Sequence, residues 1–413
     1  MWLKSYLDFS PDRPKWAYVA DDILASNVPK NVHPQERQLR INMFLQGWHA
    51  KKRAANEIPS ELKAMMSVAD KYYLQVQALA PSQDILRALP MWDHVRAVKT
   101  VLRQACISSI PTIQCRKVNH KLRTVGDFVD LAKLWSVEAH TLQDDACRCG
   151  LCVALREASG CRSPMSCMCR ANKILNVLPS RWDPRGVLPE DYKDINPDED
   201  AIEEDSVEFD RRVTTKGNIS NILRLFTEGD TPCGDCVDVS LSESAGALAI
   251  ATEGASWQDD TKCPVAGAGI YVSEHHALNK SLRLPATWRQ AGITGTMTAT
   301  LVSTRSVDGL TPIYQHLSSK YAVDSLTKLH PKLEAVGFLG HPDAALLAML
   351  VASLWARRAR TFFKLLKGRK GNPANISAFE LALEGAKKCA PDEVTMEVDP
   401  MWKLTGVNLS HMS

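Results

Sequence analysis

The sequence predicts a mostly helical N-terminal part and a C-terminal α/β domain in which helices flank a mixed sheet. Three strand-like runs follow one another at residues 247–257, 266–274 and 280–286. Helical and strand-like patterns then alternate, and a helical pattern at 375–388 comes last. Leading strands followed by alternating helices and strands are typical of a mixed sheet with helices packed on it. We therefore expect one α/β domain at 247–390.

The N-terminal region, residues 1–140, carries helical patterns and no recognisable catalytic motif. A second helix is expected to start at Ser60, which is a plausible N-cap. His120 stands alone, and no role is predicted for it. The first expected helix spans 35–52, because four apolar residues lie near one helical face: Leu39, Met43, Leu45 and Trp48.

Residues 141–188 are rich in cysteine and predict a small zinc module. Closely spaced cysteine pairs joined by a short connection are how a short segment assembles a tetrahedral zinc site. A set of free buried thiols and a redox-sensitive patch are the alternatives. The predicted ligands of one structural zinc are Cys149, Cys152, Cys161 and Cys167, with Cys147 and Cys169 as substitutes.

The remaining segments are predicted from composition. Residues 189–246 are acidic at their start and poor in apolar side chains there, which predicts a linker. Residues 391–413 are expected to form a loosely ordered C-terminal tail.

The chain has 413 residues, 45% of them apolar, and a formal net charge of +3. Any nucleic-acid surface must therefore be local. No apolar run approaches the ~20 residues that span a bilayer, so no membrane partner is expected. The N-terminus lacks the apolar core of a signal peptide, and clustered cysteines fit reduced thiols. An intracellular protein, nuclear or cytoplasmic, is predicted.

Five segments of the C-terminal domain resemble the motifs of the ribonuclease H family. The first strand ends at Glu253, where the family has Asp, and the first helix has Thr296 in place of the family's Glu. Ser318 occupies the place of the Asp that ends the fourth strand. In the last loop and helix, Arg369 replaces the family's His and Phe379 replaces its Asp.

The resemblance implies a ribonuclease H-like fold with a degenerate active site. The family's chemistry uses two divalent metals roughly 3.5–4 Å apart. Such hard ions need oxygen ligands, chiefly carboxylates. Only Glu253 remains of four expected carboxylates, so we expect no intact catalytic residues, and magnesium or manganese only if the nuclease is active.

A basic stretch near the end of this domain is a candidate nucleic-acid-binding surface. Basic residues with interleaved aromatics track phosphates and stack on bases. The alternative is that the aromatics are core and the charges are solvated. The candidate residues are Arg357, Arg358, Arg360, Lys364, Lys367, Arg369 and Lys370, interleaved with Trp355, Phe362 and Phe363.

The cysteine-rich segment also resembles the region that precedes the ribonuclease H domain in certain fungal proteins that derive from mobile elements. The resemblance implies a retroelement-derived protein. We expect it to be nuclease-dead and to bind nucleic acid, either an RNA–DNA hybrid or duplex RNA. The alternatives are an active ribonuclease that cleaves RNA–DNA hybrids and a protein-interaction module without nucleic-acid binding.

Overall fold

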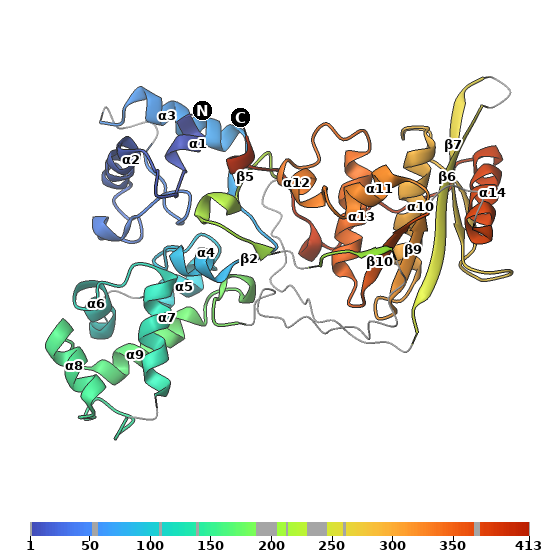
Figure 1. Ribbon diagram of the computed structural model, residues 1–413. Coiled ribbons are helices and arrows are strands. Elements are labelled where there is room, and N and C mark those ends of the chain that lie inside the picture. The colour runs from blue at the N-terminus through green and yellow to red at the C-terminus, as the bar shows by residue number, and fades with distance from the viewer. Residues whose placement is uncertain are drawn as a thin grey trace. The chain divides into compact units, whose positions relative to one another are not determined.

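The computed structural model describes residues 2–51, 57–106, 110–137, 140–186, 205–211, 214–228, 246–258, 262–366 and 372–412 (Figure 1). The chain forms two compact units. Unit 1 comprises residues 1–191, 214–236 and 404–413, and unit 2 comprises 192–213 and 237–403. The predicted helical region and the predicted cysteine-rich module thus belong to one unit, whereas the predicted linker and tail are each divided between both.

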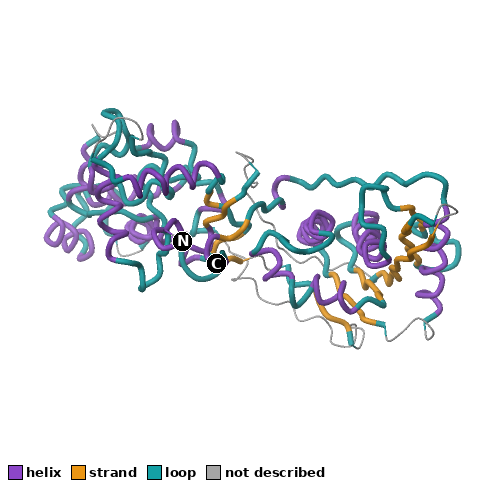
Figure 2. The backbone as a smooth tube through the Cα atoms, turned by 90° about the horizontal axis from the view of Figure 1, so that it is seen from above, coloured by secondary structure: helices purple, strands orange, loops and turns teal. Residues whose placement is uncertain are grey.

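Unit 1 is mostly helical, with two small sheets in the order β1-β5-β11 and β2-β4 (Figure 2). Its helices are α1 (Trp2–Tyr6), α2 (Lys15–Ser26), α3 (Ser60–Lys71), α4 (Gln83–Ala88), α5 (Lys99–Ala105), α6 (Pro111–Val118), α7 (Val125–Lys133), α8 (Gly150–Ser159) and α9 (Pro164–Leu175). Its strands are β1 (Gln75–Val76), β2 (Ala80–Pro81), β4 (Thr214–Thr215), β5 (Leu223–Leu225) and β11 (Val407–Asn408).

One hydrophobic core runs through unit 1, from Leu3 in α1 to Leu409 near the C-terminus. It includes the buried cysteines of the predicted zinc module, which therefore packs on the same core as the helices before it. Helix α7 begins at a capping box: the Thr124 hydroxyl accepts from the Asp127 amide at 3.2 Å, and the Asp127 carboxylate accepts from the Thr124 amide at 2.8 Å. This cap satisfies helix-end donors that have no intrahelical partner.

The helix expected over residues 35–52 is absent, and this prediction was wrong. Among its described residues, 35–51, the helical element is a 3₁₀ turn, Arg37–Leu39. Its apolar residues are buried as expected. In place of the backbone hydrogen bonds of a helix, this segment has bonds between the backbone and the side chain of Gln46. Its Oε1 accepts from the Ile41 amide at 2.6 Å, and its Nε2 donates to the Trp92 carbonyl at 2.6 Å. A contact across 46 residues of sequence therefore overrides the local helical pattern.

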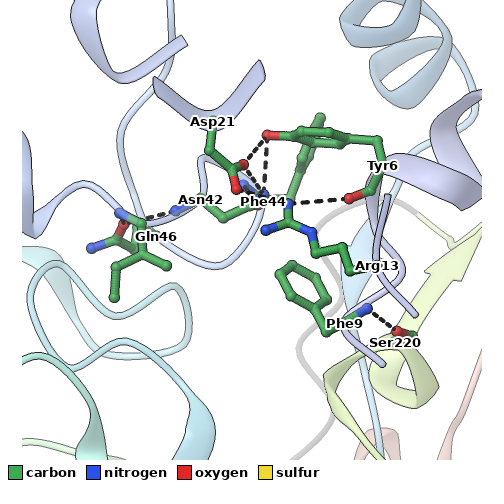
Figure 3. A network of polar contacts seen from close by, with 9 residues as sticks. Tyr6, Phe9, Arg13, Asp21, Asn42, Phe44, Gln46 and Ser220 are labelled. Carbon is green, nitrogen blue, oxygen red and sulfur yellow. Dashed lines mark hydrogen bonds and ion pairs between the residues drawn. The ribbon is translucent and has the colours of Figure 1, made fainter. Parts of the chain in front are cut away.

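A buried polar network joins this segment to the first two helices (Figure 3). The Tyr6 hydroxyl donates to Asp21 at 2.6 Å, and the Asn42 amide donates to Asp21 at 3.0 Å. Arg13 completes the network through an ion pair with Asp21 at 2.7 Å. Burial raises the pKa of Asp21 above its ordinary value, while its hydrogen bonds and Arg13 oppose that rise. The N-terminal loops are thus fixed by polar side chains.

Unit 2 is a six-stranded mixed sheet flanked by helices, which confirms the predicted α/β class. Its strands are β3 (Ser206–Glu208), β6 (Leu248–Gln258), β7 (Pro264–Tyr271), β8 (Lys280–Arg283), β9 (Ile313–Leu317) and β10 (Thr361–Leu365). Its helices are α10 (Gly292–Ser306), α11 (Lys320–Leu326), α12 (His330–Ala335), α13 (Ala344–Ala356) and α14 (Pro373–Lys387). Strand β3 and helix α12 were not predicted.

The sheet has the order β3-β10-β9-β6-β7-β8. Strands β6, β7 and β8 form an antiparallel meander, whereas β9 runs parallel to both β6 and β10. The additional strand β3 pairs antiparallel with β10 and covers that edge, with Glu208 opposite Phe362. The three leading strands and the alternating elements after them therefore occur in the expected order.

Helices α10 and α14 lie on opposite sides of β6 and β7 (Figure 1), and α13 packs on α10. Close approach of α10 requires glycine. A Cβ atom on Gly295 would lie 2.2 Å from the Gly267 carbonyl oxygen and 2.9 Å from the Gly254 Cα atom. Real Cβ atoms do not make such contacts, so glycine allows the helix to pack closely against the sheet. This close approach places Thr296 beside Gly254, inside β6.

Candidate metal centres

Among the described residues of unit 1, two groups of four potential metal ligands come together. The ligand atoms within each group all lie within 4.8 Å of one another. The first group is His140, Cys147, Cys149 and Cys152, and the second is Cys115, His120, Cys161 and Cys167. The described cysteines form no disulfide. Each group offers three sulfurs and one imidazole nitrogen, a set typical of structural zinc.

The geometry of the first group fits a tetrahedral ion. The Nδ1 atom of His140 lies 3.3 Å from the sulfur of Cys149, 3.6 Å from that of Cys152 and 3.8 Å from that of Cys147. Zn–S and Zn–N bonds of about 2.3 and 2.0–2.1 Å in a tetrahedron place sulfur and nitrogen about 3.6 Å apart. The three observed distances bracket this value.

The ring of His140 is oriented by its second nitrogen. Its Nε2 atom lies 2.7 Å from the carbonyl oxygen of Leu134, which ends helix α7 and accepts the Nε2 proton. That bond leaves Nδ1 as the atom that faces the sulfurs. Metal-binding histidines nearly always donate their other N–H in this way, because it fixes the tautomer and the ring plane. The nearby Cys149 caps α8, where its sulfur accepts from the Cys152 amide at 3.4 Å.

The second group is assembled from three separate segments. Cys115 lies on α6, and His120 follows the end of that helix. Cys161 comes directly after Gly160, which ends α8 with a φ of 65°, and Cys167 lies in the first turn of α9. The sulfurs of Cys161 and Cys167 are 3.7 Å apart. Two thiolates on one tetrahedral zinc lie about 3.8 Å apart, so this pair also fits.

An unpartnered nitrogen supports the second group. The Nε2 atom of His120 is buried and has no hydrogen-bond partner. Buried polar atoms are rarely left without a partner, and an ion bound at this nitrogen would supply one. Burial and the neighbouring Arg116 lower the pKa of His120, so the ring stays neutral as a ligand must be.

Protonation differs among the thiols. Burial raises the pKa of Cys152 to about 12 and that of Cys115 to about 11. Hydrogen bonding, first from the Thr141 hydroxyl, lowers the pKa of Cys147 to about 5. The lowered pKa favours the thiolate form of Cys147, whereas a metal ion would have to displace protons from Cys152 and Cys115.

The four predicted ligands do not come together in one site. Cys149 and Cys152 belong to the first group, and Cys161 and Cys167 belong to the second. Of the substitutes, Cys147 belongs to the first group and Cys169 to neither. Sequence analysis missed both histidines and Cys115. The signal for them was the spacing of each histidine from the nearest cysteine, four residues between Cys115 and His120 and six between His140 and Cys147.

The described positions that resemble the ribonuclease H site lie in β6, α10 and α14 and directly after β9. Glu253 is 2% exposed, and its Oε1 accepts from the Ser318 amide at 3.0 Å. The Thr296 hydroxyl donates to the Gly292 carbonyl at 3.2 Å. Phe379 is half-buried on α14. Arg369 lies outside the described residues. Among the described residues, no group of three metal-ligating side chains includes Glu253.

One further carboxylate, Asp343, contacts the start of α10. Its Oδ1 accepts from the Thr294 hydroxyl at 2.8 Å, and its Oδ2 lies 3.5 Å from the guanidinium of Arg289. Asp343 is thus already engaged by a hydroxyl and a cation. It does not supply a free ligand to a magnesium site in this arrangement.

The basic stretch is divided by burial. Arg357 is 3% exposed and donates to the carbonyls of Thr304 and Val307 at 2.9 and 3.1 Å, so it ties a helix end together and is not on the surface. The interleaved aromatics Trp355, Phe362 and Phe363 are buried, as in the core alternative. Arg358 is exposed, Arg360 and Lys364 are half-buried, and Lys367, Arg369 and Lys370 lie outside the described residues.

No helix among the described residues has the length and hydropathy needed to cross a membrane. No family model matches the chain, and no curated protein matches it. Solved structures provide the remaining comparisons.

The foamy viral protease–reverse transcriptase in complex with double-stranded DNA is similar at 18% identity and a TM-score of 0.29, over 34% of this chain and 94% of that chain. The type 1 ribonuclease H called LC9-RNase H1 is similar at 15% identity and a TM-score of 0.27, over 35% of this chain and 74% of that one. The chain is also similar to the PFV RNase H domain, at 18% identity and a TM-score of 0.27, over 34% of this chain and 96% of that domain.

Proposed function

We propose that this chain is a retroelement-derived, ribonuclease H-like protein that has lost nuclease activity and binds nucleic acid, with two structural zinc ions in unit 1. Glu253 is the one carboxylate at the four motif positions, and it accepts a hydrogen bond from the Ser318 amide. This contact is the main observation from which we infer the loss of activity. The order of strands and helices in unit 2 supports the ribonuclease H-like assignment.

Catalysis by two metals requires several carboxylates that face one point. Thr296 and Ser318 offer neutral oxygens, and the Thr296 hydroxyl already donates to a backbone carbonyl. Phe379 offers no ligand. One carboxylate leaves most of the charge of two dications uncompensated, so neither the attacking water nor the leaving oxygen is stabilised.

The zinc ions would hold the helical part of unit 1 together. Cys3His sites with four protein ligands leave no position open for a substrate, which is the arrangement of structural zinc. The two centres would connect α6, α8 and α9 with the segment after α7. Because the ligands meet only in the folded chain, the free energy of zinc binding adds to the stability of unit 1.

Cleavage is tested first. The purified chain, incubated with an RNA–DNA hybrid and magnesium or manganese, is expected to leave the RNA intact. The combined variant Glu253→Asp, Thr296→Glu, Ser318→Asp and Phe379→Asp restores the family's carboxylates and is the positive control. Cleavage by the unmodified chain that disappears in Glu253→Ala would contradict the proposal.

Binding is tested separately, by measuring hybrid affinity at several salt concentrations. The variant Arg358→Ala with Lys367→Ala removes two cations of the predicted surface. Removing one cation that binds a phosphate lowers the slope of log affinity against log salt by about one. The matched control is Lys15→Ala with Lys173→Ala, which removes two exposed lysines of unit 1. Equal affinities for both variants and the unmodified chain would contradict the predicted surface.

A protein-interaction module is the second candidate function. The burial of Arg357 and of the three interleaved aromatics favours it, because these residues are then unable to track phosphates or stack on bases. This alternative predicts no binding to hybrid or duplex RNA even at low salt.

A further inference from the structure

Arg116 lies beside the second metal centre and is completely buried. It follows the ligand Cys115 on α6 and is 0% exposed. Its Nη1 atom donates to the backbone carbonyl of the ligand Cys167 at 3.1 Å. Its Nε and Nη2 atoms are buried without a hydrogen-bond partner. A guanidinium remains protonated in proteins, so this is a buried positive charge with two unused donors.

No carboxylate compensates this charge within ion-pair distance, among the residues that the structure describes. The opposing groups that face Arg116 are the sulfurs of Cys167, Cys106 and Cys115, and burial raises the pKa of each of these thiols above its ordinary value. Two of these three cysteines belong to the second centre. An uncompensated buried charge is strongly destabilising, and such charges are normally paired.

We infer that the guanidinium of Arg116 is the counter-ion of the loaded second centre and favours metal binding there. The inference rests on the proposed zinc centre. Three thiolates, a neutral imidazole and one Zn²⁺ sum to a charge of −1, which the single charge of Arg116 neutralises. With the thiols protonated and no metal bound, the same guanidinium remains buried without a counter-charge. Arg116 therefore destabilises the metal-free unit and stabilises the zinc-bound one.

The first centre provides a matched comparison. Arg156 also donates to the carbonyl of a ligand, Cys147, at 2.8 Å, and to the Asp145 carbonyl at 2.7 Å. Its side chain is only half-buried. Water solvates its charge, so its contribution to metal binding is expected to be small.

The experiment compares Arg116→Met with Arg156→Met in the full chain. Arg116→Met is made with Cys149→Ser, which disables the first centre, and Arg156→Met is made with Cys167→Ser, which disables the second. The remaining zinc then reports on the centre that lies beside each arginine. Zinc per chain and the rate of zinc release to a chelator are measured. Cobalt in place of zinc gives a thiolate-to-metal absorption band that confirms three sulfur ligands. Arg116→Met is expected to speed release by roughly tenfold or more, as for other residues that support metal ligands. Arg156→Met is expected to leave it unchanged.

Stability separates a counter-ion from a residue that only fills space. For a counter-ion, Arg116→Met stabilises the metal-free chain against urea and destabilises the zinc-bound chain. Poorer packing alone destabilises both forms. Arg116→Lys keeps the charge and is expected to retain zinc nearly as well as the unmodified residue, which covers the case that the methionine variant fails to fold.

Two outcomes distinguish a failure of the counter-ion role of Arg116 from a failure of the proposed zinc centre. If the Cys149→Ser chain holds zinc but Arg116→Met releases it at the unmodified rate, the counter-ion role is overturned and the zinc centre stands. If the Cys149→Ser chain holds no zinc, the second centre and the role of Arg116 are both overturned.

Discussion

The Nε2 atom of His140 lies 2.7 Å from the carbonyl oxygen of Leu134, and this contact turns Nδ1 toward three cysteine sulfurs. A histidine oriented by a helix end, and not by its sequence neighbours, thus completes the first centre. His120 has the corresponding role in the second centre, where its Nε2 atom has no hydrogen-bond partner. The two histidines allow the centres to be removed one at a time.

Metal analysis of the purified chain is expected to show about two zinc ions, one for each Cys3His set. His140→Ala and His120→Ala should each lower the content by about one, because three sulfurs alone hold the ion weakly. Cys169→Ser is the control, since Cys169 belongs to neither group, and should leave two. A chain that holds a single zinc, lost in Cys149→Ser and in Cys167→Ser alike, would restore the single site predicted from the sequence.

The close approach of α10 to the sheet at Gly295 predicts a large loss of stability on substitution. Gly295→Ala places a Cβ atom 2.2 Å from a backbone oxygen, which only a backbone shift relieves. Unit 2 is expected to lose about 3 kcal/mol or more in urea unfolding. Gly309→Ala is the matched control, because no atom lies within 4 Å of its added Cβ. Equal midpoints for the two variants would show that α10 does not approach the sheet this closely.

Arg357 and Arg358 are adjacent in sequence, but their replacement is expected to change the stability of unit 2 by different amounts. Arg357→Ala leaves buried carbonyls, including those of Thr304 and Val307, without a donor and should destabilise unit 2 by about 3 kcal/mol or more. Arg358→Ala removes an exposed charge and should leave the midpoint of unfolding within about 0.5 kcal/mol. Urea unfolding followed by circular dichroism distinguishes them. A surface role for Arg357 predicts equally small changes for both variants.

His94 gives unit 1 a defined pH dependence. The side chain is 1% exposed, and burial, followed by the charge of Arg96, lowers its pKa from 6.5 to about 3. Between these two values the unfolded chain binds a proton that the folded chain does not, so stability falls as the pH falls below about 6.5.

The loss should reach about 1 kcal/mol between pH 6.5 and 5.5, since one pKa unit corresponds to about 1.4 kcal/mol. His94→Gln removes this titration and should flatten the dependence by that amount, measured as the difference between the two unfolding curves at each pH. The His275→Gln variant, on an exposed loop, is the control and should retain the full slope. Parallel curves for His94→Gln and the unmodified chain would exclude His94 as the source.

Much of unit 2 was predictable because its elements follow from short-range patterns. The runs around Ile250 and Ile270 are apolar and β-prone, and the segment from Ala344 to Ala356 is a continuous helical pattern. The absence of carboxylates at Thr296, Ser318 and Phe379 is also a property of the sequence, since side-chain chemistry does not depend on packing. Strand β3 was missed because its only support is pairing with β10, about 150 residues further along the chain.

The concentration of thiols in residues 147–169 and the lack of carboxylates at the motif positions are readable from the sequence. How the thiols are shared between the two groups follows from the packing of the helices. Cys152 lies in the first turn of helix α8, and Cys161 follows the C-cap of that helix. The two ends of α8 therefore contribute to different centres, and each centre recruits a histidine from outside the segment. The tertiary structure also placed Arg357 in the core and Arg116 beside three thiols. Spacing along a chain limits which ligands are able to meet, but the packing of α6, α7 and α9 selects those that do.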